Sequence, residues 1–176
     1  ICLGGVGRNI AENLARLGRE TSLIAPIGED AFGRDMARQC GELGIDMSRC
    51  AGSAAGSSMY LAIMDDRGEM ALALSDMSPS DAFPAGHLKK HAPFLQGAGV
   101  VVLDGNLPVE VVECAKEILA GRRILLDPVS AAKARRLRGR LSGLTAVKAN
   151  RLEAEALTDI PVGRDTLERV ADGLMA

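Results

Sequence analysis

The stretch GVVVLDGNLPVEVVECAKEILAGRRILLDP, residues 99–128, decides the fold. It opens with an apolar run that ends at Asp104, which is typical of a parallel strand covered on both faces. Pro108 suits the first turn of a helix, and a second apolar run follows and ends at Asp127. The stretch therefore predicts a strand, a helix and a second parallel strand. The side chains that this helix should bury are Val109, Val112, Ala115 and Leu119.

The same alternation continues toward the C-terminus. Residues 144–148 form another strand-like run, which ends near Asn150. The steps from Asp104 to Asp127 and from Asp127 to Asn150 have equal length, as successive βα units of similar size would give. The pattern predicts an α/β fold of the Rossmann type, in which helices flank a mostly parallel sheet.

Upstream, apolar residues recur on one helical face over residues 6–17, and Gly18 suits the end of that helix. A strand is predicted over residues 21–27. Asp30 then suits the N-cap of a second helix, which Gly44 closes.

Residues 45–76 interrupt this rhythm. Two strand-like runs, 59–64 and 70–74, flank a turn at 65–68 and predict a β-hairpin. A hairpin within an α/β chain suggests a lid-type insertion over a site, and the alternative is an antiparallel edge of the main sheet. We expect one partial α/β domain over 1–176, with this insertion at about 45–76.

Composition excludes several classes of partner. The 176 residues carry a formal net charge of −2, so no basic field favours nucleic acid or an anionic membrane. One Tyr, three Phe and no Trp argue against a base-stacking surface. The four cysteines form no Cys-x-x-Cys pair, which favours reduced thiols and a cytoplasmic location.

Polar residues follow the predicted strands. Asp104, Asn106, Asp127, Asn150 and Glu153 should all lie at the carboxyl edge of the sheet, where open parallel sheets bind ligands. Asp and Asn also cap helices and begin turns, so a single such residue says little. Together they predict a polar ligand cleft.

Gly4 and Gly5 precede the first helix and would let a ligand approach the backbone closely. Asn9 would offer a hydrogen-bond donor and an acceptor to hydroxyl groups. The alternative is a tight turn with a solvated Asn9. A dinucleotide-binding fingerprint is disfavoured, because Ile10 stands where a third small residue belongs.

Asn150 and Glu153 lie three positions apart at the start of a helix and share one face. They form either a helix cap or a site where Glu153 holds Mg²⁺ through water. Asp127 would join the same water network or begin the turn before Pro128.

Taken together, these motifs resemble the ribokinase-like (PfkB) carbohydrate kinases. Gly4-Gly5 with Asn9 matches that family's first signature, and IGEDAFG at 27–33 matches the segment after it. Asn150-x-x-Glu153 matches the motif that organises Mg²⁺ and the ATP phosphates, with Ala149 in place of the usual proline. The resemblance implies a ribokinase-like fold and ATP-dependent phosphorylation of a sugar or nucleoside hydroxyl.

Within the family, three segments look like the pseudouridine kinase branch, which implies the 5′-hydroxyl of pseudouridine as the acceptor. They are GVGRNIAENLARLG at 5–18, SDM at 75–77 and DGNLP at 104–108. Asn106 stands where sugar kinases of the family often carry Glu, which favours a nucleoside.

The resemblance also assigns site residues and partners. Substrate binding is assigned to Gly4, Gly5, Asn9, Tyr60, Asp76, Asp104 and Asn106. ATP binding is assigned to Asn150, Glu153 and Asp127, with Glu153 serving Mg²⁺ through water. The expected partner is a small-molecule substrate, with no nucleic acid and no membrane. A homodimer through the lid or the sheet edge is left open.

The family pattern also contains parts that these 176 residues lack. They are a first strand with a substrate-binding Asp, and a later Gly-Ala-Gly-Asp whose Asp is the catalytic base. The resemblance therefore assigns no catalytic residue to this chain and implies the substrate-side half of a kinase. The alternatives are a non-catalytic ligand-binding or interaction module and, against the glycine pattern, an NAD-binding domain.

Overall fold

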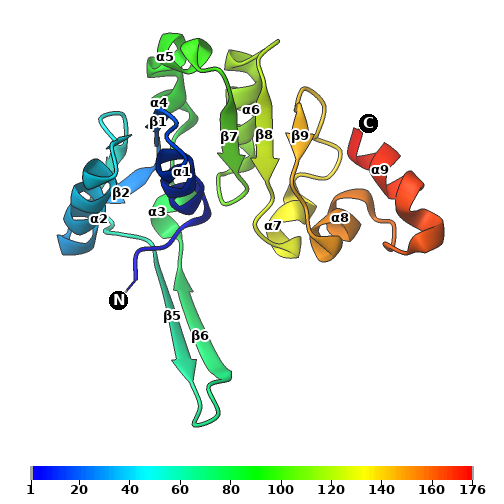
Figure 1. The fold of residues 1–176 in the computed structure, drawn as a ribbon, viewed down its shortest axis with the longest axis horizontal. Coiled ribbons are helices and arrows are strands. Elements are labelled where there is room, and N and C mark those ends of the chain that lie inside the picture. Colours follow the sequence, from blue (N-terminus) through cyan, green and yellow to red (C-terminus); the bar gives the residue numbers. More distant parts are fainter. Residues whose placement is uncertain (1, 176) are drawn as a thin grey trace. The chain divides into compact units, whose positions relative to one another are not determined.

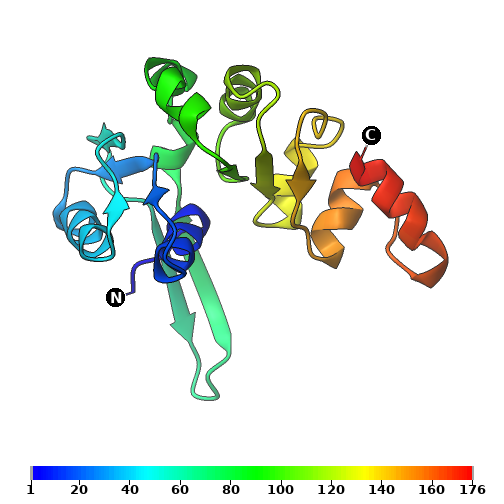
Figure 2. The same ribbon diagram turned by 45° about the horizontal axis from the view of Figure 1, so that its top comes forward.

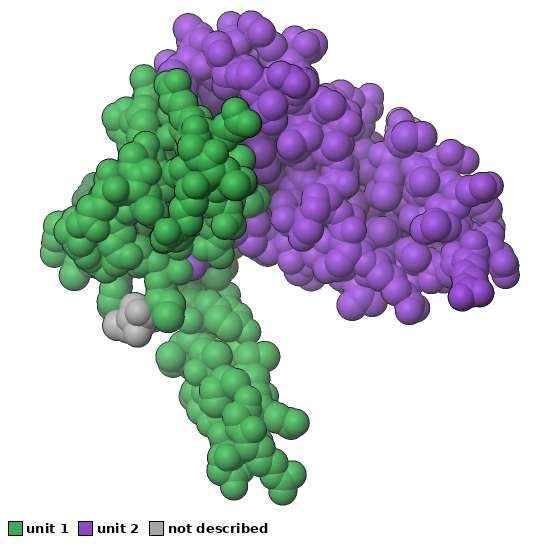
Figure 3. Space-filling view, viewed as in Figure 1, with its two compact units in different colours: residues 1–3, 8–83 green, residues 4–7, 84–176 purple. Residues whose placement is uncertain are grey.

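A computed structural model describes residues 2–175, which fall into two compact units (Figure 3). Unit 1 takes in residues 2–3 and 8–83, and unit 2 takes in residues 4–7 and 84–175. The single domain expected from the sequence stays a prediction. Among the described residues, no helix combines the length and the apolar character needed to cross a membrane.

Unit 1 contains two short parallel strand pairs. β1 (Thr21–Ser22) pairs with β3 (Ile45–Asp46), and β2 (Pro26–Gly28) pairs with β4 (Ala51–Ser53). The single strand predicted over 21–27 is therefore wrong. A turn separates β3 from β4, and in it Cys50 N–H donates to the Met47 carbonyl at 3.0 Å. The segment that faces residues 21–28 is therefore interrupted, and β1 and β2 pair with different strands.

Two helices cover these strands in unit 1. α1 (Val6–Arg16) ends close to the predicted boundary, and α2 (Ala31–Glu42) begins after its predicted cap. Their buried side chains Ala11 and Cys40 meet Ile45 of β3. The partly buried side chains packed around this cluster are Ala15, Leu23, Met36, Leu43 and Met47.

Asp30 joins the start of α2 to the segment that leads into the hairpin. Its carboxylate accepts hydrogen bonds from Gly33 N–H, Ser57 N–H and Ser57 Oγ–H, each at 2.8 Å. Gly33 has to be glycine, since a Cβ there would lie 1.8 Å from the Gly28 carbonyl oxygen. Close packing around one capping carboxylate therefore accounts for Asp30 and Gly33 of the IGEDAFG segment.

The predicted hairpin is present as a separate two-stranded sheet. β5 (Met59–Met64) pairs antiparallel with β6 (Met70–Asp76), so the hairpin is not an edge of the main sheet. The hairpin itself spans residues 59–76. Residues 45–46 and 51–53, which the expected insertion also included, form β3 and β4 and pair in parallel with other strands of unit 1. The hairpin extends away from the rest of unit 1 (Figure 3), and both of its faces are exposed. Its large exposed apolar side chains are Met59, Tyr60, Leu61, Ile63, Met64, Met70, Leu72 and Leu74.

Unit 2 is built on the parallel sheet that the sequence predicted. β7 (Val101–Asp104), β8 (Ile124–Asp127) and β9 (Ala146–Val147) lie in that order (Figures 1 and 2). Asp104 is the register partner of Asp127, so the two apolar runs end level with each other. β9 is shorter than the predicted strand over 144–148.

The remaining described helices are short. They are α3 (Ser78–Asp81) in unit 1 and, in unit 2, α4 (Ala85–Lys90), α5 (Ala92–Gly97), α6 (Val109–Ile118), α7 (Ala131–Arg136), α8 (Arg151–Thr158), a 3₁₀ turn (Arg164–Thr166) and α9 (Leu167–Met175).

α6 buries a wider face than its sequence pattern predicts. Val112, Ala115 and Leu119 are buried as expected, Val109 is only partly buried, and Val111 and Cys114 are buried as well. The reason is that α6 also contacts α4 and α5, which cover a second side of the helix.

The Asp30 cap makes the stability of the fold depend on pH. The N–H of Gly33, together with the hydroxyl and N–H of Ser57, lowers the Asp30 pKa from 3.8 to about 2. A carboxyl group with a depressed folded-state pKa stabilises the fold above its unfolded pKa and loses that contribution as pH falls. The free energy of unfolding should therefore drop between pH 3.8 and about 2. Asp30→Asn should remove much of this drop in urea titrations at several pH values.

The control for this experiment is Asp66→Asn, at the exposed hairpin turn. It should keep the pH profile of the wild type. Superimposable profiles for Asp30→Asn and the wild type would show that the carboxylate does not couple folding to pH.

Candidate functional site

The carboxylate of Asp104 organises the carboxyl end of β7 in unit 2. Its Oδ2 accepts a hydrogen bond at 2.9 Å from the backbone N–H of Gly7, in the first turn of α1. Its Oδ1 accepts two more from Asn106, at 2.8 Å from the backbone N–H and 2.9 Å from Nδ2. The structure thus brings the start of α1, Asp104 and Asn106 together at one sheet edge.

Gly4 and Gly5 form an exposed segment directly before α1. Gly5 has a φ of +97°, a conformation that residues with a Cβ rarely adopt. A Cβ on Gly4 would meet no atom within 4 Å, so the space beside this backbone is open. A ligand has room to approach here, and the turn geometry alone also accounts for Gly5.

Asp127 lies beside Asp104 at the same sheet edge. Its Oδ1 accepts a hydrogen bond from Val129 N–H at 2.9 Å, and its Oδ2 lies 3.3 Å from Lys148 Nζ. The loop after β7 packs tightly against the loop after β8, since a Cβ on Gly105 would lie 2.7 Å from the Pro128 carbonyl oxygen. Asp127 therefore begins its turn, as one alternative predicted, and also holds a lysine at this edge.

Asn150 and Glu153 form a reciprocal capping box at the start of α8. Glu153 Oε2 accepts from Asn150 N–H at 2.9 Å and Oε1 accepts from Asn150 Nδ2 at 2.8 Å. Glu153 N–H donates back to Asn150 Oδ1 at 3.0 Å. Glu153 is only 2% exposed, so its carboxylate is buried and already paired.

Direct metal coordination by Glu153 is disfavoured, because its carboxylate is buried and both of its oxygens already accept hydrogen bonds. Within residues 2–175, no group of three or more His, Cys, Asp or Glu side chains is placed to hold a metal ion. The predicted role of Glu153 toward Mg²⁺ through water stays a prediction.

The other three predicted substrate residues belong to unit 1. Asn9 is exposed on α1, and Tyr60 is exposed on β5, where its hydroxyl lies 3.4 Å from Met70 Sδ. Asp76 ends β6 and accepts from Ser78 N–H at 3.0 Å, which lowers the pKa of its carboxyl group. These residues are placed within unit 1, and their part in binding stays a prediction.

Two charged residues in contact with predicted site residues were missed. Lys148 directly follows β9, whose register with β8 places it opposite Asp127. Arg8 lies between Gly7 and Asn9 and donates to Asn9 Oδ1 at 3.3 Å. The signals were weak, since a lysine after a strand and an arginine on the polar face of a helix are usually solvated.

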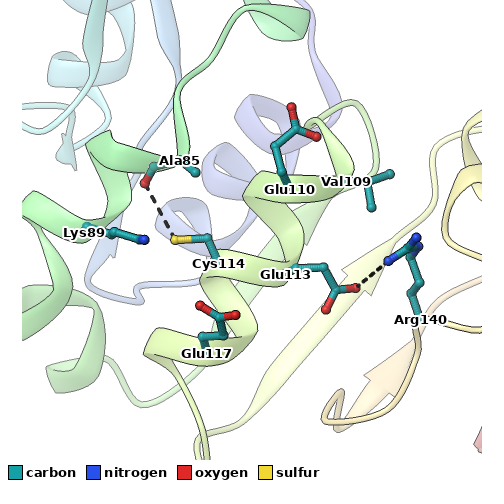
Figure 4. A pocket seen from close by; sticks show the side chains of 8 residues that line it. All are labelled: Ala85, Lys89, Val109, Glu110, Glu113, Cys114, Glu117 and Arg140. Atoms are coloured by element: carbon teal, nitrogen blue, oxygen red, sulfur yellow. Dashed lines mark hydrogen bonds and ion pairs between the residues drawn. The ribbon is translucent and has the colours of Figure 1, made fainter.

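An open hollow of about 540 Å³ in unit 2 lies apart from the predicted site residues (Figure 4). α4 and α6 supply most of its lining: Ala85, Lys89, Val109, Glu110, Glu113, Cys114, Glu117 and Arg140. Glu113 is paired with Lys116 at 3.1 Å and with Arg140 at 3.9 Å, so its charge is already balanced. The hollow holds no arrangement that suggests chemistry.

An apolar groove of about 320 Å³ lies between α8 and α9 of unit 2 and includes Asn150. Its apolar lining comes from Ala149, Ala154, Val162, Leu167, Val170, Ala171 and Leu174.

Comparison with known proteins identifies relatives along almost the whole chain. It is 39% identical over 170 residues to pseudouridine kinase of Escherichia coli K12, which covers 96% of this chain and 54% of that protein. A carbohydrate kinase structure from Agrobacterium tumefaciens matches with a TM-score of 0.84 at 27% identity, covering 98% of this chain and 56% of that chain. The chain thus spans about half the length of these relatives.

The fold also matches an Arabidopsis thaliana ribokinase, whose structure contains ribose and ATP, with a TM-score of 0.75 at 19% identity. That match covers 97% of this chain and 55% of that chain, and confirms the ribokinase-like α/β fold in incomplete form. The model of the pfkB family of carbohydrate kinases matches residues 2–175. With its parallel sheet, the first turn of α1 bonded to Asp104 and these relatives, the chain belongs to the pfkB family of carbohydrate kinases.

Proposed function

We propose that the protein containing these residues transfers the γ-phosphoryl group of ATP to the 5′-hydroxyl of pseudouridine. The structural observation that carries the proposal is the Asp104 carboxylate, which joins Gly7 in the first turn of α1 to Asn106. The identity with E. coli pseudouridine kinase supports this substrate above a free sugar. The ATP in the Arabidopsis ribokinase structure supports ATP as the phosphoryl donor.

The residues at this edge suit a neutral ligand rich in hydroxyl groups. Asn106 uses Nδ2 toward Asp104, and its Oδ1 has no partner among the described residues, so it would accept from a ligand N–H or O–H. The exposed backbone at Gly4 and Gly5 would let such a ligand come close. This chain would thus bind and orient the acceptor, which is much of what phosphoryl transfer needs from a protein.

Bound ATP would supply the phosphoryl group, and Mg²⁺ would neutralise its phosphate charge. From this chain, Asn150 and Glu153 would act toward that site only through water, because their side chains bond each other. We also propose that this kinase is cytoplasmic, because the pattern of its four cysteines favours reduced thiols.

A non-catalytic interaction module is the second candidate. It is favoured by the hairpin, whose apolar side chains are exposed on both strands. Exposed apolar patches and unpaired strand edges are common sites of protein association.

The substrate is tested with the full-length protein and ATP, against pseudouridine, uridine, ribose and fructose. We expect kcat/KM to be highest for pseudouridine, because Asn106 stands where sugar kinases of the family often carry Glu. Equal or better turnover of ribose would contradict the nucleoside assignment. Phosphorylation of none of the four compounds, with nucleoside binding intact, would favour a non-catalytic ligand-binding or interaction module.

The role of Glu153 is tested by Glu153→Gln in the full-length protein. If Glu153 positions metal-bound water, kcat should fall and the Mg²⁺ concentration for half-maximal rate should rise. Glu155→Gln, on the same helix, is the control for a general effect on α8 and should leave the Mg²⁺ titration unchanged. An unchanged titration in Glu153→Gln would show that the residue only caps the helix.

The 176-residue polypeptide alone should show no ATP-dependent phosphorylation, because the family resemblance assigns it no catalytic residue. It should also self-associate as its concentration rises. The expected contact is the exposed apolar hairpin, so Leu72→Lys should weaken the association in sedimentation velocity. Leu17→Lys, at an apolar side chain that is 74% exposed on a different segment, is the control. A monomer at all concentrations, or turnover of pseudouridine by this polypeptide, would contradict the expectation.

A further inference from the structure

Asn9 does not stand alone on the surface of α1, because the side chain before it is held in a charged network. Arg8 Nη1 lies 2.6 Å from Glu12 Oε2, and Arg16 Nη2 lies 2.7 Å from Glu12 Oε1. Arg8 and Glu12 are only 12% and 20% exposed, whereas Arg16 is 61% exposed. The guanidinium of Arg8 is therefore fixed by a partly buried ion pair within unit 1.

The same Nη1 of Arg8 donates to Asn9 Oδ1 at 3.3 Å. A guanidinium group has only donors, so the amide of Asn9 has to turn its oxygen toward Arg8. Asn9 is exposed, and no described residue accepts a hydrogen bond from its Nδ2. The outward atom of the amide is therefore the donor, Nδ2.

The Nε of Arg8 bears on why a guanidinium group stands at this position. It is buried and lacks a hydrogen-bond partner among the described residues. An unpaired buried donor costs stability, which offsets part of what the ion pair with Glu12 contributes. A guanidinium group kept at this position despite that cost fits a role beyond stability.

We propose that Arg8 is a positioning residue, which locks the amide of Asn9 so that its Nδ2 donates to an acceptor atom of the substrate. The inference rests on the proposed function, in which Asn9 contacts the nucleoside or sugar. It adds a requirement on the substrate. The substrate atom opposite Asn9 must be a hydrogen-bond acceptor, such as a hydroxyl or carbonyl oxygen.

Steady-state kinetics of the full-length protein with ATP and pseudouridine test this requirement. Arg8→Met removes every donor and keeps most of the length, so the Asn9 amide becomes free to turn over. KM should rise about tenfold with a much smaller change in kcat, the size expected for one hydrogen bond. Arg8→Lys restores one donor and should recover most of the loss.

Two further variants separate positioning from other effects. Asn9→Asp keeps the shape and the contact with Arg8 but turns an acceptor outward, so KM should rise by tenfold or more. Arg16→Met weakens the same ion-pair network without touching Asn9, and KM should change by less than about twofold. If Asn9→Asp binds substrate as well as the wild type, Asn9 acts as an acceptor and the inference is wrong.

NMR of protein labelled with ¹⁵N at asparagine side chains gives a readout that does not need activity. Arg8→Met should shift the Asn9 side-chain signals and leave those of Asn150, which Glu153 holds, in place. Unshifted Asn9 signals would overturn the inference even in an active enzyme. A wild type that phosphorylates none of the tested compounds, with shifted Asn9 signals, would overturn the proposed function and keep the positioning.

Discussion

The carboxylate of Asp104 is the contact on which the rest of the site depends. It ends a buried strand, and it pairs with Gly7 N–H, one of the first donors of α1, which have no partner inside the helix. Both oxygens are engaged, so the strand end, the loop to Asn106 and the first turn of α1 hold one another in place. A neutral side chain of different shape would leave the Gly7 N–H without its partner.

Close packing of backbone explains why the motifs are rich in glycine. Gly105 fits against the Pro128 carbonyl, and Gly33 fits against the Gly28 carbonyl, at distances that no Cβ tolerates. Gly105 lets the loop after β7 pack on the loop after β8, and Gly33 lets the first turn of α2 pack on the end of β2. Asp127 then begins one turn and Asp30 caps the other. Glycine patterns of this kind mark loop packing as much as phosphate binding, which fits the argument against a dinucleotide fingerprint.

The features that could be predicted from the sequence are those that a continuous local pattern encodes, such as an apolar run or a helix cap. The apolar runs before Asp104 and Asp127 became parallel strands in register, and Asp30 capped its helix. The break within 21–27 was not predictable, because it coincides with a turn at Met47–Cys50 in the opposing segment, which the local pattern of 21–27 does not encode. The Arg8 contact was missed for a related reason, since charges spaced four apart on a helix usually mark a solvated face.

Three asparagines, Asn9 in unit 1 and Asn106 and Asn150 in unit 2, show how charged neighbours decide what an amide offers. Asn106 turns Nδ2 to Asp104, which leaves an acceptor, and Asn9 turns Oδ1 to Arg8, which leaves a donor. Asn150 uses both ends of its amide within the capping box, so it has the least to offer a ligand directly. The amide oxygen and nitrogen are alike in size, so the hydrogen-bond partners supply the chemical difference. In each unit a charged neighbour, Arg8 for Asn9 and Asp104 for Asn106, thus fixes which end of the amide faces outward.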